Sequence, residues 1–284
     1  MRKQIARLIP VALMGLFLAV GSQAATKEEM GVTINLAGKQ RMLTQKMSKE
    51  ALLIAKGIDA DANKASLEKT AALFDTTLAG LAAGDASLGL PETTDPAILE
   101  QLEVVRGQWV EFKGSIGAVL GGDTSTAVSD QIAQQNLPLL KEMNKAVQMY
   151  TKASGSTLDP AVATTINLAG KQRMLTQKMT KELLLVANGI DADTNKANLA
   201  KTVALFQRTL TGLLDGDADL GLPGTKDQAI RDQLAAVQGL WDQYKPVLDA
   251  VDTSDAGLAK AAKLNLPLLK EMNITVKMYE QSAK

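Results

Sequence analysis

The amino-acid sequence predicts an all-α protein made of two tandem up-down four-helix bundles related by internal duplication. The segment TINLAGKQRMLTQKM stands at 33–47 and returns unchanged at 165–179. Apolar residues recur at helical spacing between Gly and Pro punctuation, and no stretch alternates as a half-buried strand would. Aromatic residues make up 3% of the chain, while Ala, Leu, Lys, Gln and Met are frequent, which suits helical bundles.

The repeat extends well beyond this segment. Trp109 returns 132 residues later as Trp241, as do the turns at 57–61 and 89–91. The segment NLPLLKEMN at 136–144 returns at 265–273, an offset of 129, so the second copy is three residues shorter. A unit of roughly 130 residues is large enough for its own core. We therefore expect the first bundle over 25–155 and the second over 156–284.

Residues 1–24 are expected to be a cleavable export signal. Three basic residues open the chain, an apolar run follows at 9–20, and Ser22-Gln23-Ala24 offers small side chains for cleavage. This run is shorter than the roughly 20 residues that span a bilayer, although an uncleaved N-terminal anchor is the alternative. Cleavage would remove the three basic residues and leave 28 basic against 31 acidic, a net of −3. We expect a periplasmic protein that has no stable membrane span and does not bind nucleic acid.

Residues that start or stop helices predict the bounds of the first two helices in each repeat. The first runs from about Lys27 to Lys56 and stops at Gly57. Asp61 or Asn63 is expected to cap the second helix, which runs to about residue 83, before a Gly-Asp turn.

The other two helices follow a loop. Asp95 is expected to cap the third helix, with Pro96 at its first position and an end near residue 120. The fourth runs from about 124 to 153 and contains Pro138, which should kink it or break it locally. A polar linker at 154–159 leads to Pro160, where the next unit is expected to begin.

The repeated first helix has two apolar stripes rather than one. The core seam of its own bundle consists of Leu36, Leu43, Met47 and Ile54. A second stripe, roughly opposite, holds Ile34, Gly38, Arg41, Gln45 and Leu52, and recurs as Ile166, Gly170, Arg173, Gln177 and Leu184. A helical glycine costs about 1 kcal/mol relative to alanine, so Gly38 indicates the close approach of another backbone. The second stripe is therefore interpreted as a packing surface with an arginine near its middle.

If the two copies pack about a pseudo-two-fold axis, Arg41 and Arg173 face each other. Two like charges 4 Å apart repel by about 4 kcal/mol at an effective dielectric near 20. A small oxyanion between them removes this repulsion and suits the guanidinium fork. The alternative is that both arginines are exposed and neutralised by nearby Glu or Asp.

Other residues near this stripe are candidates for binding the anion or for raising the local positive potential. Candidate ligand-binding residues beside the two arginines are Gly38, Gly170, Gln45, Gln177, Asn35 and Asn167. The asparagines also have a purely structural interpretation on the helix rim. Lys39, Lys46 and Lys49 are expected to be solvated and to raise the local positive potential.

The composition gives little support to an enzyme or a metalloprotein. The chain contains no His and no Cys, which removes most transition-metal ligands and any His- or Cys-dependent catalysis. The stretch from Asp59 resembles an EF-hand loop, but Lys64 and Thr70 stand where the loop needs Gly and Glu. We expect no enzyme activity, no cofactor and no metal site.

The segment NLAGKQRMLTQKM resembles the signature of the PilJ/NarX-like family, whose members read as an NLAGRQRMLSQR-type stretch. Family members are periplasmic ligand-binding domains of type IV pilus chemotaxis transducers and of nitrate/nitrite sensor kinases. In the nitrate sensors, two subunits each place one arginine around a single anion. The resemblance implies that Arg41 and Arg173 are those arginines and that Gly38 and Gly170 match the preceding small residue.

Two functions follow as hypotheses. The first is a soluble periplasmic binding protein that holds one small oxyanion, nitrate or nitrite first, between the two repeats. Because no membrane span, connector or kinase region follows the bundles, it would buffer the anion or present it to a membrane sensor. The second is a ligand-free interaction module that docks a membrane receptor or a type IV pilus or chemotaxis component.

Overall fold

The computed structural model describes residues 25–283, so the export signal expected at 1–24 lies outside the described residues. This part of the chain is all-α, with two tandem up-down bundles of four helices each and no β-strand. The first half comprises α1 (Lys27–Ala55), α2 (Ala60–Ala83), α3 (Pro96–Leu120) and α4 (Thr126–Ala153). The second half comprises α5 (Pro160–Ala187), α6 (Ala192–Asp215), α7 (Gln228–Asp249) and α8 (Asp255–Gln281).

Helix starts follow local capping chemistry in most places. Asp95 Oδ1 accepts hydrogen bonds from the backbone of Ala97 at 2.8 Å and of Ile98 at 3.3 Å, and Pro96 opens α3, as predicted. Asp159 and Pro160 repeat this arrangement at α5.

The predicted cap of α2 is wrong. The helix starts at Ala60, and its N-cap is Asp59, whose backbone lies in the left-handed region at φ 44°. Asp61 and Asn63 therefore lie inside the helix. Asn63 Nδ2 instead donates to the carbonyl of Ile58 at 3.0 Å, which closes the turn from α1.

The prolines of the fourth helices do not interrupt them. Both α4 and α8 continue as α-helix through Pro138 and Pro267, so the predicted local break is not present. Pro138 is exposed, and its missing N–H costs α4 one hydrogen bond without opening the helix.

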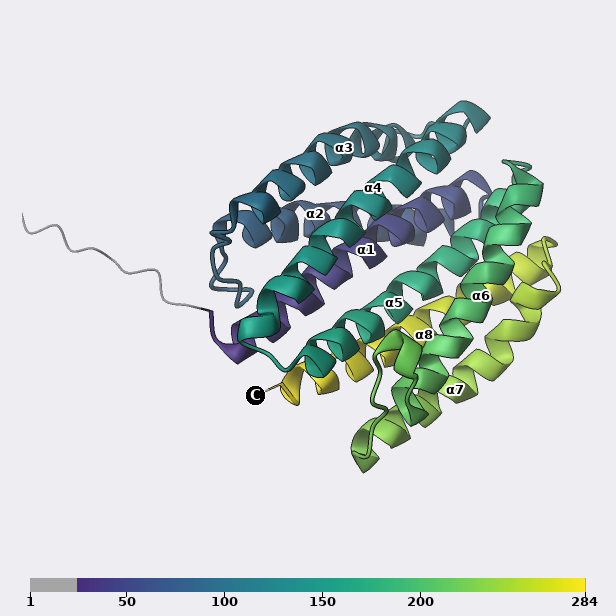
Figure 1. Ribbon diagram of the computed structural model, residues 1–284. Coiled ribbons are helices and arrows are strands. Elements are labelled where there is room, and N and C mark those ends of the chain that lie inside the picture. Colours follow the sequence, from purple (N-terminus) through teal and green to yellow (C-terminus); the bar gives the residue numbers. More distant parts are fainter. Residues whose placement is uncertain (1–24, 284) are drawn as a thin grey trace, which may run out of the picture.

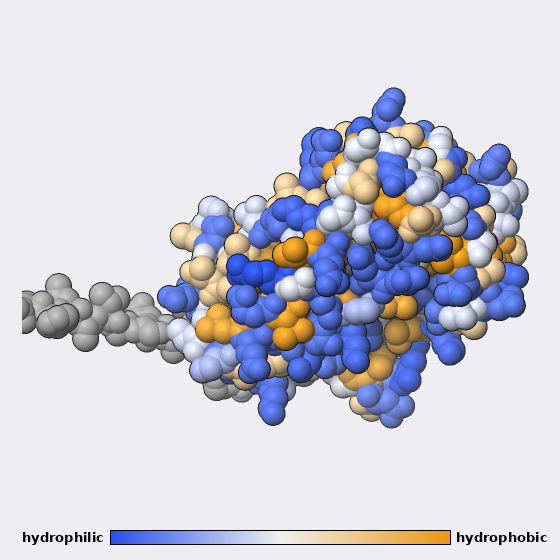
Figure 2. Space-filling view, turned by 90° about the horizontal axis from the view of Figure 1, so that it is seen from above, coloured by the Kyte–Doolittle hydropathy of each residue, from blue (hydrophilic) through white to orange (hydrophobic). Residues whose placement is uncertain are grey.

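The two repeated helices lie side by side at the centre of the molecule. In Figure 1, α1 and α5 are flanked by the rest of their own halves, with α3 and α7 on opposite outer sides. Helix α1 packs on α2 and α4 of its own half and on α5 and α8 of the other, and α5 packs on α6, α8 and α4. The outer surface seen in Figure 2 is mostly hydrophilic, with separate hydrophobic patches.

This central position explains why the repeated segment is identical in both copies. Of the fifteen residues at 33–47, all but Leu36, Lys39 and Lys46 are buried. A substitution on nearly any face of the helix would therefore meet a neighbour, and close-packed interiors tolerate few changes of volume.

Candidate functional site

The second stripe of each repeated helix forms the contact between the two halves. Ile34, Arg41, Gln45 and Leu52 are each at most 1% exposed, and Ile166, Gln177 and Leu184 are fully buried. Arg41 and Arg173 meet over the two helical glycines. A Cβ added at Gly38 would lie 3.3 Å from Arg41 Nη2 and 3.8 Å from Arg173 Nη2, and at Gly170 the two distances are exchanged. The glycines therefore leave the space that both guanidinium groups share.

Arg41 is held by amide and carbonyl oxygens from both halves. Its Nη1 donates to Asn144 Oδ1 on α4 at 2.8 Å. Its Nη2 donates to Asn167 on α5, to Oδ1 at 2.8 Å and to the backbone carbonyl at 3.1 Å. The arginine of one half is thus positioned by an asparagine of the other.

Arg173 has the corresponding partners across the pseudo-two-fold axis. Its Nη1 donates to Asn273 Oδ1 on α8 at 3.2 Å, and its Nη2 donates to the carbonyl of Asn35 at 3.0 Å. The side chain of Asn35 turns away and donates through Nδ2 to Glu280. The structure therefore brings both predicted asparagines into contact with the arginines, Asn167 through its side chain and its backbone carbonyl and Asn35 through its backbone carbonyl.

The electrostatics of this pair are unusual for arginine. Burial, reinforced by the charge of Arg173, lowers the pKa of Arg41 to about 9. Burial also lowers the pKa of Arg173 to about 10, against which the charge of Glu280 acts. Within residues 25–283 neither guanidinium lies within ion-pair distance of a carboxylate, and both Nε atoms are buried without a hydrogen-bond partner. The alternative of exposed, carboxylate-neutralised arginines is wrong.

The two predicted glutamines serve a neighbouring network rather than the arginines. Gln45 Nε2 donates to Asn136 Oδ1, and Gln177 Nε2 donates to Asn265 Oδ1, each at 2.8 Å. Their Oε1 atoms are buried without a partner. The glutamines lie one helical turn from the arginines and contact asparagines rather than the guanidinium groups.

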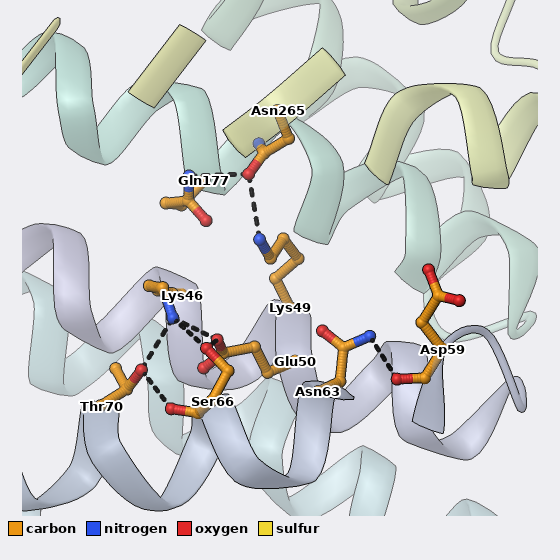
Figure 3. A network of polar contacts seen from close by, with 9 residues as sticks. All are labelled: Lys46, Lys49, Glu50, Asp59, Asn63, Ser66, Thr70, Gln177 and Asn265. Carbon is orange, nitrogen blue, oxygen red and sulfur yellow. Dashed lines mark hydrogen bonds and ion pairs between the residues drawn. The ribbon is translucent and has the colours of Figure 1, made fainter. Parts of the chain in front are cut away.

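The expectation that the lysines of the repeated helix are solvated is wrong for Lys49, which is 2% exposed. Its Nζ donates to Asn265 Oδ1 at 3.0 Å, across the junction of the two halves (Figure 3). Lys46 is largely buried too, and donates to Glu50, Ser66 and Thr70. Lys39 is half-buried. The reason is that α1 is enclosed by helices on all sides, so its polar face has little access to water.

Four further asparagines partner these cations and were not predicted from the sequence. All four come from the two copies of NLPLLKEMN: the first residue, Asn136 or Asn265, meets a lysine, and the last, Asn144 or Asn273, meets an arginine. The signal was present in the sequence as a second strictly repeated segment with asparagine at both ends.

Fold and junction together define a class of protein: a duplicated helical-bundle domain with a buried cationic centre between its halves. The chain belongs to the PilJ family, because the family model described as "Type IV pili methyl-accepting chemotaxis transducer N-term" matches residues 23–135 and 160–265. One matched segment falls in each half. None of the helices between residues 25 and 283 has the length and apolar character needed to cross a bilayer.

Curated relatives are chemotaxis proteins. AlkN of Alcanivorax borkumensis, which bears the name of a methyl-accepting chemotaxis protein, is 25% identical over 226 residues, or 78% of this chain and 31% of the relative. The methyl-accepting chemotaxis protein McpN of Pseudomonas aeruginosa is 35% identical over 121 residues, or 42% of this chain and 22% of the relative. The chain thus spans under a third of either relative, and the similarity concerns one portion of each transducer.

Proposed function

We propose that the chain is a periplasmic sensory module of chemotaxis transducer type that binds one small oxyanion, nitrate or nitrite first, between Arg41 and Arg173. The observation that carries the proposal is a pair of buried guanidinium groups that share one space, lack a carboxylate partner among the described residues, and keep unused Nε donors. An anion there would receive charge-assisted hydrogen bonds from both halves and would remove the repulsion between them.

Binding at this position has a structural consequence. Each arginine also holds a fourth helix, Arg41 through Asn144 on α4 and Arg173 through Asn273 on α8. An anion that draws the guanidinium groups together would therefore shift α4 relative to α8. Such a displacement is what a membrane sensor or pilus-chemotaxis protein could read if it contacts these helices. We propose no catalytic step for the site.

Titration calorimetry with sodium nitrate and nitrite, at constant ionic strength against chloride, tests the proposal. One anion per chain is expected, and Arg41→Ala or Arg173→Ala should each weaken binding at least about tenfold, the factor given by 1.4 kcal/mol. Arg208→Ala, on an exposed arginine, is the matched control and should leave binding unchanged. Absence of heat with every oxyanion, or equal affinity in all three variants, would contradict the proposal.

A ligand-free docking module is the second candidate. Its supporting observation is the pair of exposed apolar side chains on α3, Val104 at 44% and Val110 at 65%. The expected result in that case is no anion binding, together with co-purification of a membrane receptor or pilus component that Val110→Lys abolishes.

A further inference from the structure

A cavity of about 180 Å³ lies where the two halves meet, between α4, α5 and α6. Its wall includes Gln134, Leu137, Lys181, Glu182, Thr194 and Asn198. It is smaller than the roughly 300–1,000 Å³ clefts that hold drug-sized ligands, so it suits a molecule of few heavy atoms. It shares no residue with the arginine pair.

A buried cation of α5 lines this cavity and reaches toward α4. Lys181 is 2% exposed, and its Nζ donates to Asn136 Oδ1 at 2.9 Å. That is the one acceptor its ammonium has among the described residues, so two of its three N–H groups are free to donate. Burial lowers the pKa of Lys181 to about 7, with Glu182 opposing and Lys178 reinforcing the shift. An anionic group beside Lys181 would restore its charged form.

A carboxylate of α5 with an unpaired oxygen also lines the cavity. Glu182 is 1% exposed, and its Oε1 accepts from Lys178, whereas its Oε2 is buried with no hydrogen-bond partner. Asp191, the residue before α6, also lines the cavity, and its side chain does not cap the helix. Because a buried unpaired acceptor is costly, a donor that reaches the Glu182 carboxylate would stabilise it.

The first half differs at the same positions. Glu50 Oε2 is buried without a partner, as Glu182 Oε2 is, but Glu50 Oε1 accepts from Ser66 as well as from Lys46, whereas the second half has Asn198 in place of Ser66 and no such bond to Glu182. Gln134 in the cavity wall corresponds to Lys263 on the other side. The side at Glu182 is therefore less positive and has fewer donors from the protein, which favours a cationic ligand group there.

We propose that this cavity binds a small zwitterion carrying an ammonium group and a carboxylate, the chemistry of a free aliphatic amino acid. Its ammonium would lie beside the carboxylates of Glu182 and Asp191, and its carboxylate would accept from Lys181 Nζ. Leu137, Leu185 and Ile190 supply apolar surface for its side chain. Since the cavity is formed by α4 of one half and by α5 and α6 of the other, the ligand would tie the halves together at a second point.

Titration calorimetry with L-alanine, L-valine and L-leucine tests this assignment, with acetate and n-butylamine as singly charged probes. At least one amino acid should bind at one per chain, and both singly charged probes should bind at least about tenfold more weakly. Glu182→Gln should weaken binding at least about tenfold, and Glu50→Gln, its counterpart in the first half, should not. Arg208→Ala, on an exposed arginine, should leave amino-acid binding intact, and the titration contains no nitrate or nitrite, so a failure of the oxyanion site would not affect this result.

A second pair of variants tests the cavity in case Glu182→Gln fails to fold. Ala133→Leu extends a side chain from the α4 wall into the cavity and should abolish binding, whereas Ala262→Leu changes the equivalent position beside the first half. No heat from any amino acid with the unaltered protein overturns the proposal. So does equal loss of binding in both members of either pair.

Discussion

Buried cations with neutral partners are the feature that sets this junction apart at the scale of single residues. Arg41, Arg173, Lys49 and Lys181 are each at most 3% exposed. Each donates to amide or carbonyl oxygens rather than to a carboxylate. Desolvation of an ion costs several kcal/mol when no opposite charge compensates it. These residues therefore weaken the folded state by themselves, and a bound anion would recover part of that loss.

Lys49 and Lys181 should make the stability of the protein depend on pH. Burial lowers their pKa from 10.5 to about 8 and about 7, respectively. Between pH 7 and 9 the unfolded chain then binds more protons than the folded one, so the free energy of unfolding rises with pH. The slope is at most about 1.4 kcal/mol per pH unit for each lysine. Urea denaturation from pH 6 to 9 should show a smaller slope in Lys181→Met than in the unaltered protein.

The control for this measurement is Lys201→Met, which replaces an exposed lysine on α6. Its slope should match that of the unaltered protein. If Lys181→Met and the unaltered protein differ by the same free energy at every pH, Lys181 is charged throughout the window and the prediction fails.

At the scale of helices, the two-sided burial of α1 and α5 is the main determinant of the fold. The sequence alone predicted it, because Ile34, Gly38 and Leu52 have no reason to lie on a solvated face. The partners of the buried cations could not be predicted in the same way. Arg41 meets a residue of α4, and Lys49 meets a residue of α8. These contacts depend on the relative position of helices more than 90 residues apart in the sequence, and the helical periodicity of one segment does not contain that information.

Gly38 should separate helix stability from anion binding. Gly38→Ala adds helix propensity of about 1 kcal/mol. Its new methyl group would stand 3.3 Å from Arg41 Nη2, so the guanidinium must move. We expect a higher melting temperature together with nitrate affinity lowered about tenfold. Calorimetry and thermal denaturation of the same sample measure both effects.

Gly107→Ala on α3 is the matched control. A Cβ at Gly107 meets none of the described atoms within 4 Å, so only the propensity gain should remain. Unchanged nitrate affinity in both variants would show that the guanidinium groups do not need the space over Gly38, and the site would have to lie elsewhere.

At the scale of the whole molecule, the two halves are expected to unfold as one unit. Separating them would expose the apolar residues of the second stripes and would break the bonds from Arg41 to Asn167 and from Lys181 to Asn136. Each half therefore contributes part of the core of the other, although each is large enough for a core of its own.

The two tryptophans allow this to be measured, because Trp109 lies in the first half and Trp241 in the second. In a Trp241→Phe background, fluorescence reports on the first half alone. Leu210→Ala removes a buried side chain of the second half and should cost about 2–5 kcal/mol. If the halves unfold together, the urea midpoint reported by Trp109 falls by the same amount as with Leu78→Ala, the equivalent change in the first half. If Leu78→Ala lowers this midpoint and Leu210→Ala leaves it unchanged, the two bundles unfold independently. An anion between Arg41 and Arg173 could then not be read out as a change in either half.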